Sequence, residues 1–339
     1  MVAGTNIGST ISLHKLLISD QSLSPFRHNI YSDKSEQDIE AFITKYDLWF
    51  PQFKHINTMN AYMYPDASFE RATLCGKLMA LLYYIDDEYA DTAESKGIMG
   101  SSVPPEYLAK IERSAVAFET GWLPPHSGGL ERAFQELRLE IQDTVEPEWM
   151  IRFSQDVRQH ITYALNLQAY GWETDGNVPF ERYAWLREVI SGMYLAIDLI
   201  EYHNDFVLLP HVIYHPTIRR LQQACSRIAA FANDLFSYER EVLQEGLRFN
   251  LLAVLQRTQN LSFPEAVQLS IEITNHETEE FFRLSNEIAI WDDTTNALIQ
   301  RYVECMKYHV SATWHWQMNT IRYRSTTSPF MELIKPLIG

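Results

Sequence analysis

The stretch Gly76–Asp91 reads GKLMALLYYIDDEYAD, in which an apolar run that favours burial is followed by four acidic residues in six positions. A helix turns about 100° per residue, so Asp87 and Asp91 point within about 40° of each other, with Asp86 to one side. Like charges this close raise each other's pKa unless a cation intervenes. The pattern therefore indicates either a Mg²⁺ site built from carboxylates or an acidic helix end in solvent.

The same helical periodicity extends along most of the chain, where apolar residues recur every three or four positions and period-two runs are scarce. This pattern predicts an all-α fold, and the absence of repeats or long linkers favours a single domain over residues 1–339. Residues 1–30 are expected to form a loosely attached N-terminal strap. The predicted helices cover about 36–50, 68–95, 105–120, 129–145, 147–172, 179–207, 216–245, 247–258, 264–289 and 293–318.

Composition restricts the class of protein and the partners. The chain has 46% apolar residues, enough to fill a sizeable core, and a net charge of −16, which argues against nucleic acid as a partner. No segment is long and apolar enough to predict a membrane span, and the N-terminus does not resemble a signal peptide. Because three widely spaced cysteines suit reduced thiols, we expect a cytoplasmic protein.

A second stretch with chemical potential is Phe231–Glu241, FANDLFSYERE, in which Asn233, Ser237 and Glu241 are spaced i, i+4, i+8. On a straight α-helix this spacing stacks three hard oxygen ligands on one face over about 12 Å. The alternative is an ordinary exposed polar face. The apolar residues on most other sides of this helix favour the ligand interpretation.

These two stretches resemble the aspartate-rich motif and the N-D-x-x-S-x-x-x-E triad of class I terpene synthases of microbial type, sesquiterpene synthases of fungi included. Two further elements match the family. Arg187 stands where the family has its diphosphate-sensing arginine, and WQMNTIRY supplies a tryptophan, Trp316, followed by the pair Arg322 and Tyr323. The resemblance spans Asp86 to Tyr323 and implies the class I terpenoid synthase fold, an α-helical bundle around a central apolar cavity.

The resemblance also implies roles for individual residues. Three Mg²⁺ ions are expected with diphosphate bound, two of them on Asp86, Asp87 and Asp91. The third would be bound by Asn233, Ser237 and Glu241. The diphosphate would be held by Arg187, Asn233, Arg240, Arg322 and Tyr323, so that the carbon–oxygen bond ionises to an allylic cation.

Some positions depart from the family pattern or leave alternatives open. Helix geometry favours Asp87 over Asp86 as the partner of Asp91, and Arg240 stands where many relatives have lysine. The segment Ile190–Gly192 lies where relatives break a helix. Tyr83 and Trp316 are candidates for stabilising the cation by cation–π attraction, and ordinary core packing is the alternative.

Two other acidic stretches carry weaker signals. Asp292 and Asp293 in WDDTTN resemble a second aspartate-rich motif of a prenyltransferase, but they are better interpreted as a helix N-cap and first turn. The stretch Glu201–Asp205, EYHND, is interpreted as a polar helix end.

The resulting hypothesis is a Mg²⁺-dependent terpene cyclase, a lyase that acts on farnesyl diphosphate and forms a sesquiterpene hydrocarbon or alcohol. The alternatives are a synthase of monoterpenes or linear alcohols from geranyl diphosphate, an isoprenyl diphosphate synthase, and a non-catalytic isoprenoid-binding protein. We expect a monomer or a homodimer, and the sequence does not distinguish them.

Overall fold

The computed structural model describes residues 11–20, 26–50, 53–87, 103–165, 167, 172, 177–288 and 291–334. Within these residues the chain is helical and contains no β-strand, and a single β-bridge joins Ser325 to Ile334. The prediction of an all-α fold is confirmed.

The helices of the described residues include longer and shorter ones. The longer ones are α1 (Ser32–Lys45), α2 (Phe53–Met63), α3 (Phe69–Ile85), α5 (Pro105–Thr120), α6 (Gly129–Ile141), α7 (Pro147–Leu165), α8 (Phe180–Ile190), α9 (Met193–His203), α11 (Pro216–Tyr238), α12 (Leu251–Thr258), α13 (Phe263–Ser285) and α14 (Asp293–Asn319). The short ones are η1 (Leu13–Lys15), η2 (Leu17–Ser19), α10 (Pro210–Ile213), the π-helical turn η6 (Glu239–Gln244), η7 (Ile321–Tyr323) and η8 (Met331–Leu333).

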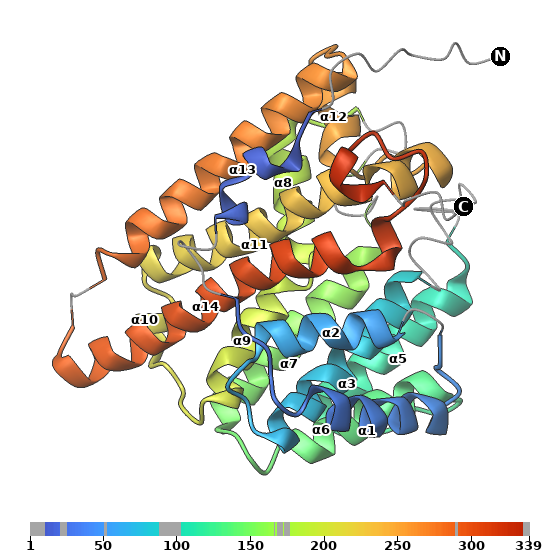
Figure 1. Ribbon diagram of the computed structural model, residues 1–339. Helices are drawn as coiled ribbons and strands as arrows, with labels where there is room; N and C mark the ends of the chain where they lie inside the picture. Colours follow the sequence, from blue (N-terminus) through green and yellow to red (C-terminus); the bar gives the residue numbers. More distant parts are fainter. Residues whose placement is uncertain are drawn as a thin grey trace.

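The long helices α11 and α14 lie side by side through the middle of the molecule, with α13 along the outer side of α11 (Figure 1). Helix α3 packs against α1, α2, α6 and α9, and α5 packs against α6 and α7. This arrangement surrounds α3, whose sequence is apolar on nearly all sides, as expected for a helix in the interior. Asp86 and Asp87 directly follow Ile85, the last residue of α3. They therefore lie at the point where this interior helix ends.

One helix of the structure was not predicted, and two predicted helices differ from it in form. Helix α2 was not predicted, because its sequence, FKHINTMNAYM, mixes polar and apolar residues. The helix predicted over 179–207 is broken at Gly192, whose φ of 77° lies in the left-handed region. The helix predicted over 216–245 becomes a π-helical turn after Tyr238. The part of the helix predicted over 68–95 that follows Asp87 lies outside the described residues.

Both ends of the described chain are docked. The expectation of a loose strap is wrong for residues 11–20, because Leu13 and Leu16 are fully buried and the Leu17 amide donates to Asn275 Oδ1 of α13 at 2.8 Å. At the other end, Phe330 and Leu333 are buried. Burial of these apolar side chains stabilises segments that have little secondary structure of their own.

The two weaker acidic stretches have different outcomes. Asp292 caps α14 by accepting a hydrogen bond from the Thr295 amide at 3.0 Å, which confirms the N-cap prediction. The interpretation of Glu201–Asp205 as a polar helix end is wrong for Glu201, which is buried and ion-paired with Arg152 of α7.

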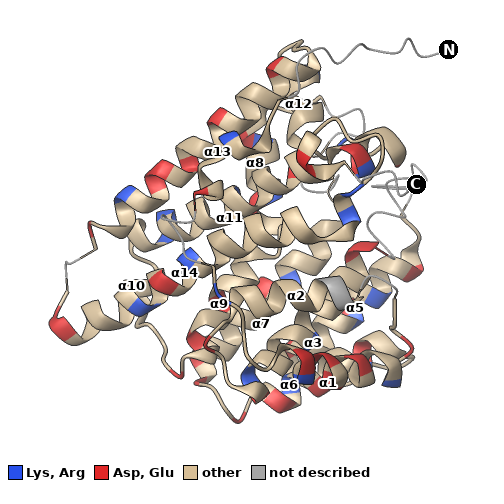
Figure 2. Cartoon of the chain, viewed as in Figure 1, with Lys and Arg blue, Asp and Glu red and all other residues tan. Residues whose placement is uncertain are grey.

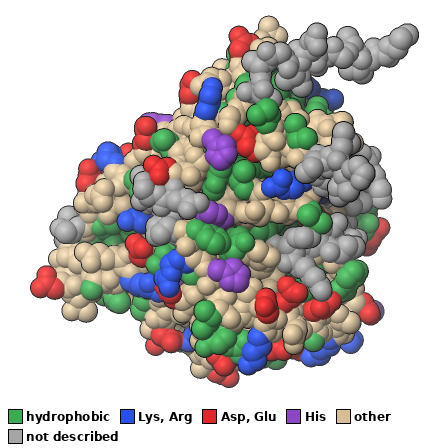
Figure 3. All heavy atoms as spheres, in the orientation of Figure 1, with side chains coloured by type: hydrophobic (Ala, Val, Ile, Leu, Met, Phe, Trp, Pro, Cys, Tyr) green, Lys and Arg blue, Asp and Glu red, His purple; other side chains and the backbone are tan. Residues whose placement is uncertain are grey.

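Charged side chains of both signs lie along the outer helices, with acidic residues prominent on α1 and α13 (Figure 2). On the face drawn in Figure 3, basic and acidic side chains are interspersed with apolar ones. Within the described residues, none of the helices has the length and apolar character that crossing a membrane requires.

Candidate active site

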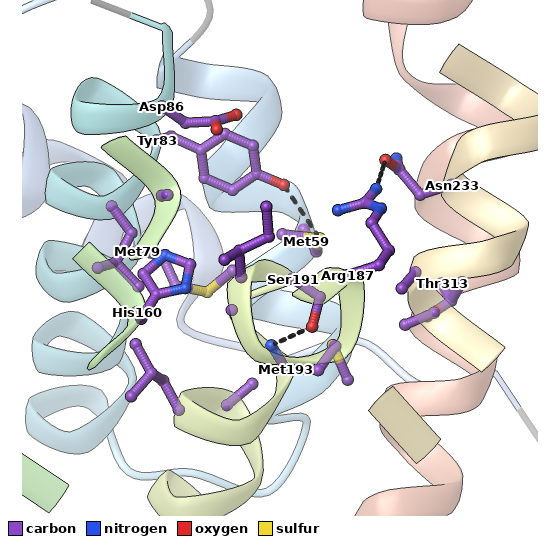
Figure 4. Close-up of a pocket in the computed structure, with 18 of the residues that line it drawn as sticks. Met59, Met79, Tyr83, Asp86, His160, Arg187, Ser191, Met193, Asn233 and Thr313 are labelled. Atoms are coloured by element: carbon purple, nitrogen blue, oxygen red, sulfur yellow. Dashed lines mark hydrogen bonds between the residues drawn. The ribbon is translucent and has the colours of Figure 1, made fainter. Parts of the chain in front are cut away.

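An apolar cavity of about 180 Å³ lies between α2, α3, α7, α8, α9, α11 and α14. Figure 4 shows part of its wall, with Tyr83 of α3 and Asp86, which directly follows α3, on one side and Arg187 and Asn233 on the other. Its lining combines aliphatic and methionine side chains with the predicted residues Tyr83, Asp86, Arg187, Asn233, Glu241, Trp316, Arg322 and Tyr323. The fold thus collects predicted residues that are up to 240 positions apart in the sequence, Tyr83 to Tyr323, around one cavity.

The end of α3 forms the acidic side of the site. The Arg322 guanidinium donates two hydrogen bonds to Asp87, from Nη1 to Oδ2 at 3.1 Å and from Nη2 to Oδ1 at 2.6 Å. Arg240 Nη2 lies 3.6 Å from Asp87 Oδ1. Asp86 lines the cavity, and its burial, together with the neighbouring charge of Asp87, raises its pKa to about 6. Asp91, the third acid of the predicted motif, lies outside the described residues.

The position of Arg187 is determined by two residues of α11. Its Nε donates to Asp234 Oδ1 at 2.9 Å, and its Nη2 donates to Asn233 Oδ1 at 2.8 Å. Asp234 is fully buried and also accepts hydrogen bonds from Tyr183 Oη and from the Leu251 amide. These contacts fix one edge of the guanidinium, and the residue lines the cavity with the other.

Sequence reasoning did not assign a role to Asp234 or Tyr183. Asp234 is the second residue of the NDLFSYERE motif, and an acid in an otherwise apolar helix is a signal that could have been noticed. Tyr183 carries no comparable signal, because a tyrosine in an apolar helix is ordinary.

The predicted triad is split by the change in helix type. Asn233 Nδ2 donates to Tyr323 Oη at 2.8 Å, while Glu241 Oε2 accepts a hydrogen bond from Asn250 Nδ2 at 3.3 Å. The bond from the Glu245 amide to the Arg240 carbonyl spans five residues, as in a π-helix. The prediction of a straight i, i+4, i+8 face is therefore wrong at Glu241, although this carboxylate still lines the cavity.

The residues present fit a hard divalent cation. Ser237 Oγ is fully buried and has no hydrogen-bond partner among the described residues, an arrangement that costs free energy unless something else is bound. Carboxylate, amide and hydroxyl oxygens are the donors that Mg²⁺ prefers. Within the described part of the chain, no three His, Cys, Asp or Glu side chains gather around one point. An ion there would accordingly need Asn233, Ser237 or a bound phosphate.

Aromatic rings form the wall next to this polar end. The ring centroids of Tyr83 and Trp316 are 6.3 Å apart, and those of Trp316 and Tyr323 are 5.8 Å apart and perpendicular. Arg322 lies over the Tyr83 ring, 5.9 Å from its centroid. These rings can stabilise positive charge by cation–π attraction.

The sequence model of terpene synthase family 2, C-terminal metal binding, matches residues 77–280, more than half of the chain. The chain belongs to this family. It is a terpene synthase, an enzyme of the lyase class.

Individual relatives agree with this membership. The chain is similar to a (+)-T-muurolol synthase of Roseiflexus castenholzii, with 27% identity over 78% of this chain and 79% of the relative. It is also similar to terpene synthase 1 of Dictyostelium purpureum, with 25% identity over 92% of this chain and 83% of the relative. Among solved structures, germacradien-4-ol synthase from Streptomyces citricolor has a TM-score of 0.73 and 20% identity over 93% of this chain and 99% of that one, which shows the shared fold.

Proposed function

We propose that this terpene synthase ionises farnesyl diphosphate in a Mg²⁺-dependent reaction, releases diphosphate and forms a sesquiterpene hydrocarbon or alcohol. The observation that carries the proposal is the meeting of Asp86, Arg187, Asn233 and Arg322 at one end of an apolar cavity. A charged head group and a hydrocarbon chain would each find a matching surface there.

Three Mg²⁺ ions are part of the proposal. Asp86, Asp87 and Asp91 would hold two of them, and Asn233, Ser237 and Glu241 the third. When bound, the ions supply positive charge that neutralises the leaving diphosphate.

The arginines and Tyr323 would hold the diphosphate by charge-assisted hydrogen bonds. Arg187 is positioned for this by Asp234, which leaves its orientation independent of the ligand. Arg322 and Arg240 contact Asp87 and would exchange part of that contact for phosphate oxygens. The apolar and aromatic wall excludes water from the cation that ionisation leaves behind.

The choice of farnesyl diphosphate is supported by a relative. The name of the Roseiflexus castenholzii enzyme states that it cyclises (2E,6E)-farnesyl diphosphate, and the family covers most of the present chain. Geranyl diphosphate, yielding a monoterpene or a linear alcohol, is the second candidate. Chain elongation by an isoprenyl diphosphate synthase is less well supported, because the second acidic stretch caps α14 at Asp292.

The test measures diphosphate and hydrocarbon products separately. The purified protein is incubated with Mg²⁺ and geranyl, farnesyl or geranylgeranyl diphosphate, with and without a chelator. We expect chelator-sensitive diphosphate release and a volatile C15 product from farnesyl diphosphate, and a loss of both in Asn233→Ala. No release from any of the three substrates would contradict the proposal, and consumption only after addition of isopentenyl diphosphate would favour elongation. A folded protein that binds a prenyl diphosphate without consuming it would favour a binding role.

A further inference from the structure

The segment that follows α14 at the C-terminal end of the chain (Figure 1) carries two of the residues proposed to hold the diphosphate. Its first attachment is to α14 itself, because the Thr320 amide donates to the Trp316 carbonyl at 2.8 Å. Arg322 and Tyr323 follow in η7, and Ser325 comes two residues later. A second attachment at Ser325 would therefore help to determine the position of both residues.

This second attachment is the side chain of Glu239. Ser325 Oγ donates to the carboxylate and lies 2.6 Å from each of its oxygens, and Thr327 Oγ1 donates to Oε1 at 2.5 Å. The two partners are also bonded to each other, since the Thr327 amide donates to Ser325 Oγ at 3.0 Å. Glu239 is buried. Hydrogen bonds to a charged acceptor are stronger than those between neutral groups, so this contact fixes the segment firmly.

The carboxylate belongs to the turn that carries two of the proposed metal ligands. Glu239 is the first residue of the π-helical turn η6, two positions after Ser237 and two before Glu241. Sequence reasoning gave it no role. One side chain thus connects the turn of the third proposed Mg²⁺ site to the segment that carries Arg322 and Tyr323.

The connection between the attachment and the site is short. Two residues of backbone span at most about 7 Å, so the link from Ser325 to Tyr323 absorbs little displacement. If Ser325 moves, Tyr323 and Arg322 move with it. Tyr323 Oη accepts a hydrogen bond from Asn233 Nδ2 at 2.8 Å, and Arg322 donates two to Asp87. Such a displacement would lengthen these bonds.

We propose that Glu239 is a positioning residue for diphosphate binding. It docks the C-terminal segment on η6 and so holds Arg322 and Tyr323 at the charged end of the cavity before a ligand arrives. By charge alone a carboxylate weakens the binding of a nearby anion, so loss of this charge would tighten binding, whereas release of the segment weakens it. The role rests on the proposed function, because it assumes that Arg322 and Tyr323 hold the diphosphate.

The test is a calorimetric titration with inorganic diphosphate at saturating Mg²⁺. In Glu239→Ala we expect the Kd to rise about tenfold. Loss of folded protein would instead lower the number of sites and leave the Kd unchanged. Glu239→Gln should stay within about twofold of wild type, because an amide can hydrogen-bond both hydroxyls. An unchanged or lowered Kd in Glu239→Ala would overturn the proposal, as would an equal rise in Glu239→Gln.

The partner side gives an independent arm of the same experiment. Ser325→Ala combined with Thr327→Val removes the two hydroxyls and leaves η6 intact, and the Kd should again rise about tenfold. Adding Glu239→Ala to this pair should change the Kd by less than about twofold, because the contact is already lost. A fully additive effect would show that Glu239 acts in another way and would overturn the proposal.

The matched control is Glu332→Ala. Glu332 also anchors the C-terminal segment by its carboxylate, which accepts a hydrogen bond from the Leu13 amide at 2.9 Å, but this contact leads to the N-terminal segment and not to η6. Buried Phe330 and Leu333 keep the remaining part of the segment docked in every variant. The Kd of Glu332→Ala should stay within about twofold of wild type. A rise equal to that of Glu239→Ala would overturn the specific role of Glu239.

Two further measurements keep this proposal apart from the proposed function. Absence of diphosphate release from any prenyl substrate contradicts the proposed function, and the titration still decides on Glu239. Hydrogen exchange of the ligand-free protein tests the docking alone. The amides of residues 320–327 should exchange about tenfold faster in Glu239→Ala than in wild type, since the segment opens more readily. Equal exchange rates would overturn the docking role.

Discussion

Ser237 and Ser226 are buried serines of the same helix, α11, and their hydroxyls are used differently. Ser226 Oγ donates to the Glu188 carbonyl at 3.0 Å, whereas Ser237 Oγ has no partner among the described residues. A structural hydroxyl stabilises the fold, and an unpartnered one does not. The contrast supports the proposed ligand role of Ser237, because its hydroxyl does not serve the fold as that of Ser226 does.

Ser237→Ala is therefore expected to raise the free energy of unfolding of the Mg²⁺-free protein by about 1 kcal/mol, because no hydrogen bond is lost and a buried hydroxyl without a partner among the described residues is removed. The Mg²⁺ concentration needed for half-maximal diphosphate release should rise about tenfold, the equivalent of about 1.4 kcal/mol. Ser226→Ala, the matched control, should cost about 1 kcal/mol of stability and leave the Mg²⁺ requirement unchanged. An unchanged Mg²⁺ requirement in Ser237→Ala would remove this residue from the ligand set. Urea unfolding and Mg²⁺ titration measure the two effects.

Asp234 provides a second comparison, this time between ion pairs. Asp234→Asn leaves the buried guanidinium of Arg187 without a counter-charge, and breaking such a pair costs about 3 kcal/mol or more. Asp205→Asn breaks a pair with Arg71 in which the aspartate is exposed, and should cost less than about 1 kcal/mol. Chemical denaturation of both variants gives the comparison. Equal losses would show that Arg187 is held by something other than Asp234.

At the scale of the helices, two glycines with left-handed backbone conformation stand next to helices that carry site residues. Gly192 has a φ of 77° and separates α8 from α9, and Gly246 has a φ of 75° and follows η6. A Cβ on Gly246 would meet nothing within 4 Å, whereas a Cβ on Gly192 would touch the His160 ring. Both positions are strained for alanine, but only Gly192 borders the cavity among these two.

Gly192→Ala and Gly246→Ala should each lose about 1–2 kcal/mol of stability, because both place a Cβ at positive φ. Only Gly192→Ala should change the ratio of products, since its added methyl group enters the cavity wall. Thermal unfolding and product analysis by gas chromatography test both statements. A changed product ratio in Gly246→Ala as well would show that stability loss alone alters the products.

The accuracy of the sequence predictions also varies at this scale. Helices with a clear apolar stripe, such as α5 and α14, begin where the sequence predicted, because a Pro-containing first turn or an N-cap aspartate defines their start. Helix α2 was missed because its stability depends on packing against α3 and α14 rather than on its own residues. The π-helical turn after Tyr238 has no local sequence signal, so the displacement of Glu241 could not be predicted.

Across the whole molecule, buried neutral histidines connect folding to pH. His309 is buried between Tyr64 and His203, and its pKa is lowered to about 3 by burial and by the charge of His203. The unfolded chain takes up a proton on this residue near pH 6.5 and the native protein does not. Its contribution to stability is thus fully present above pH 6.5 and is lost as the pH falls towards 3.

In His309→Leu, the free energy of unfolding should decline less steeply with falling pH, by about 1.4 kcal/mol per pH unit between roughly pH 6 and 4. Urea unfolding of wild type and variant across this range measures the difference. Above pH 7 the two pH profiles should run parallel. Parallel profiles over the entire range would show that the histidine titrates alike in both states.

The sequence predicted which residues gather around the cavity better than it predicted the residues that support them. Asp86, Arg187, Asn233, Glu241, Arg322 and Tyr323 line the cavity together, whereas Asp87, Ser237 and Arg240 are not part of its lining. Asp234 holds Arg187 directly, and Tyr183 donates a hydrogen bond to Asp234. Such assignments depend on which helices meet in space, and a linear pattern does not contain that information.

The contact between Asp87 and Arg322 has a consequence for ligand discrimination. A cation alone must compete with a guanidinium for the carboxylate, and an anion alone must take the guanidinium away and leave Asp87 with less compensation. A ligand that carries both charges can replace the ion pair of Asp87 and Arg322 with two new pairs, cation with Asp87 and anion with Arg322. This part of the site should therefore bind free phosphate or free Mg²⁺ weakly, and it should bind the two together with much higher affinity.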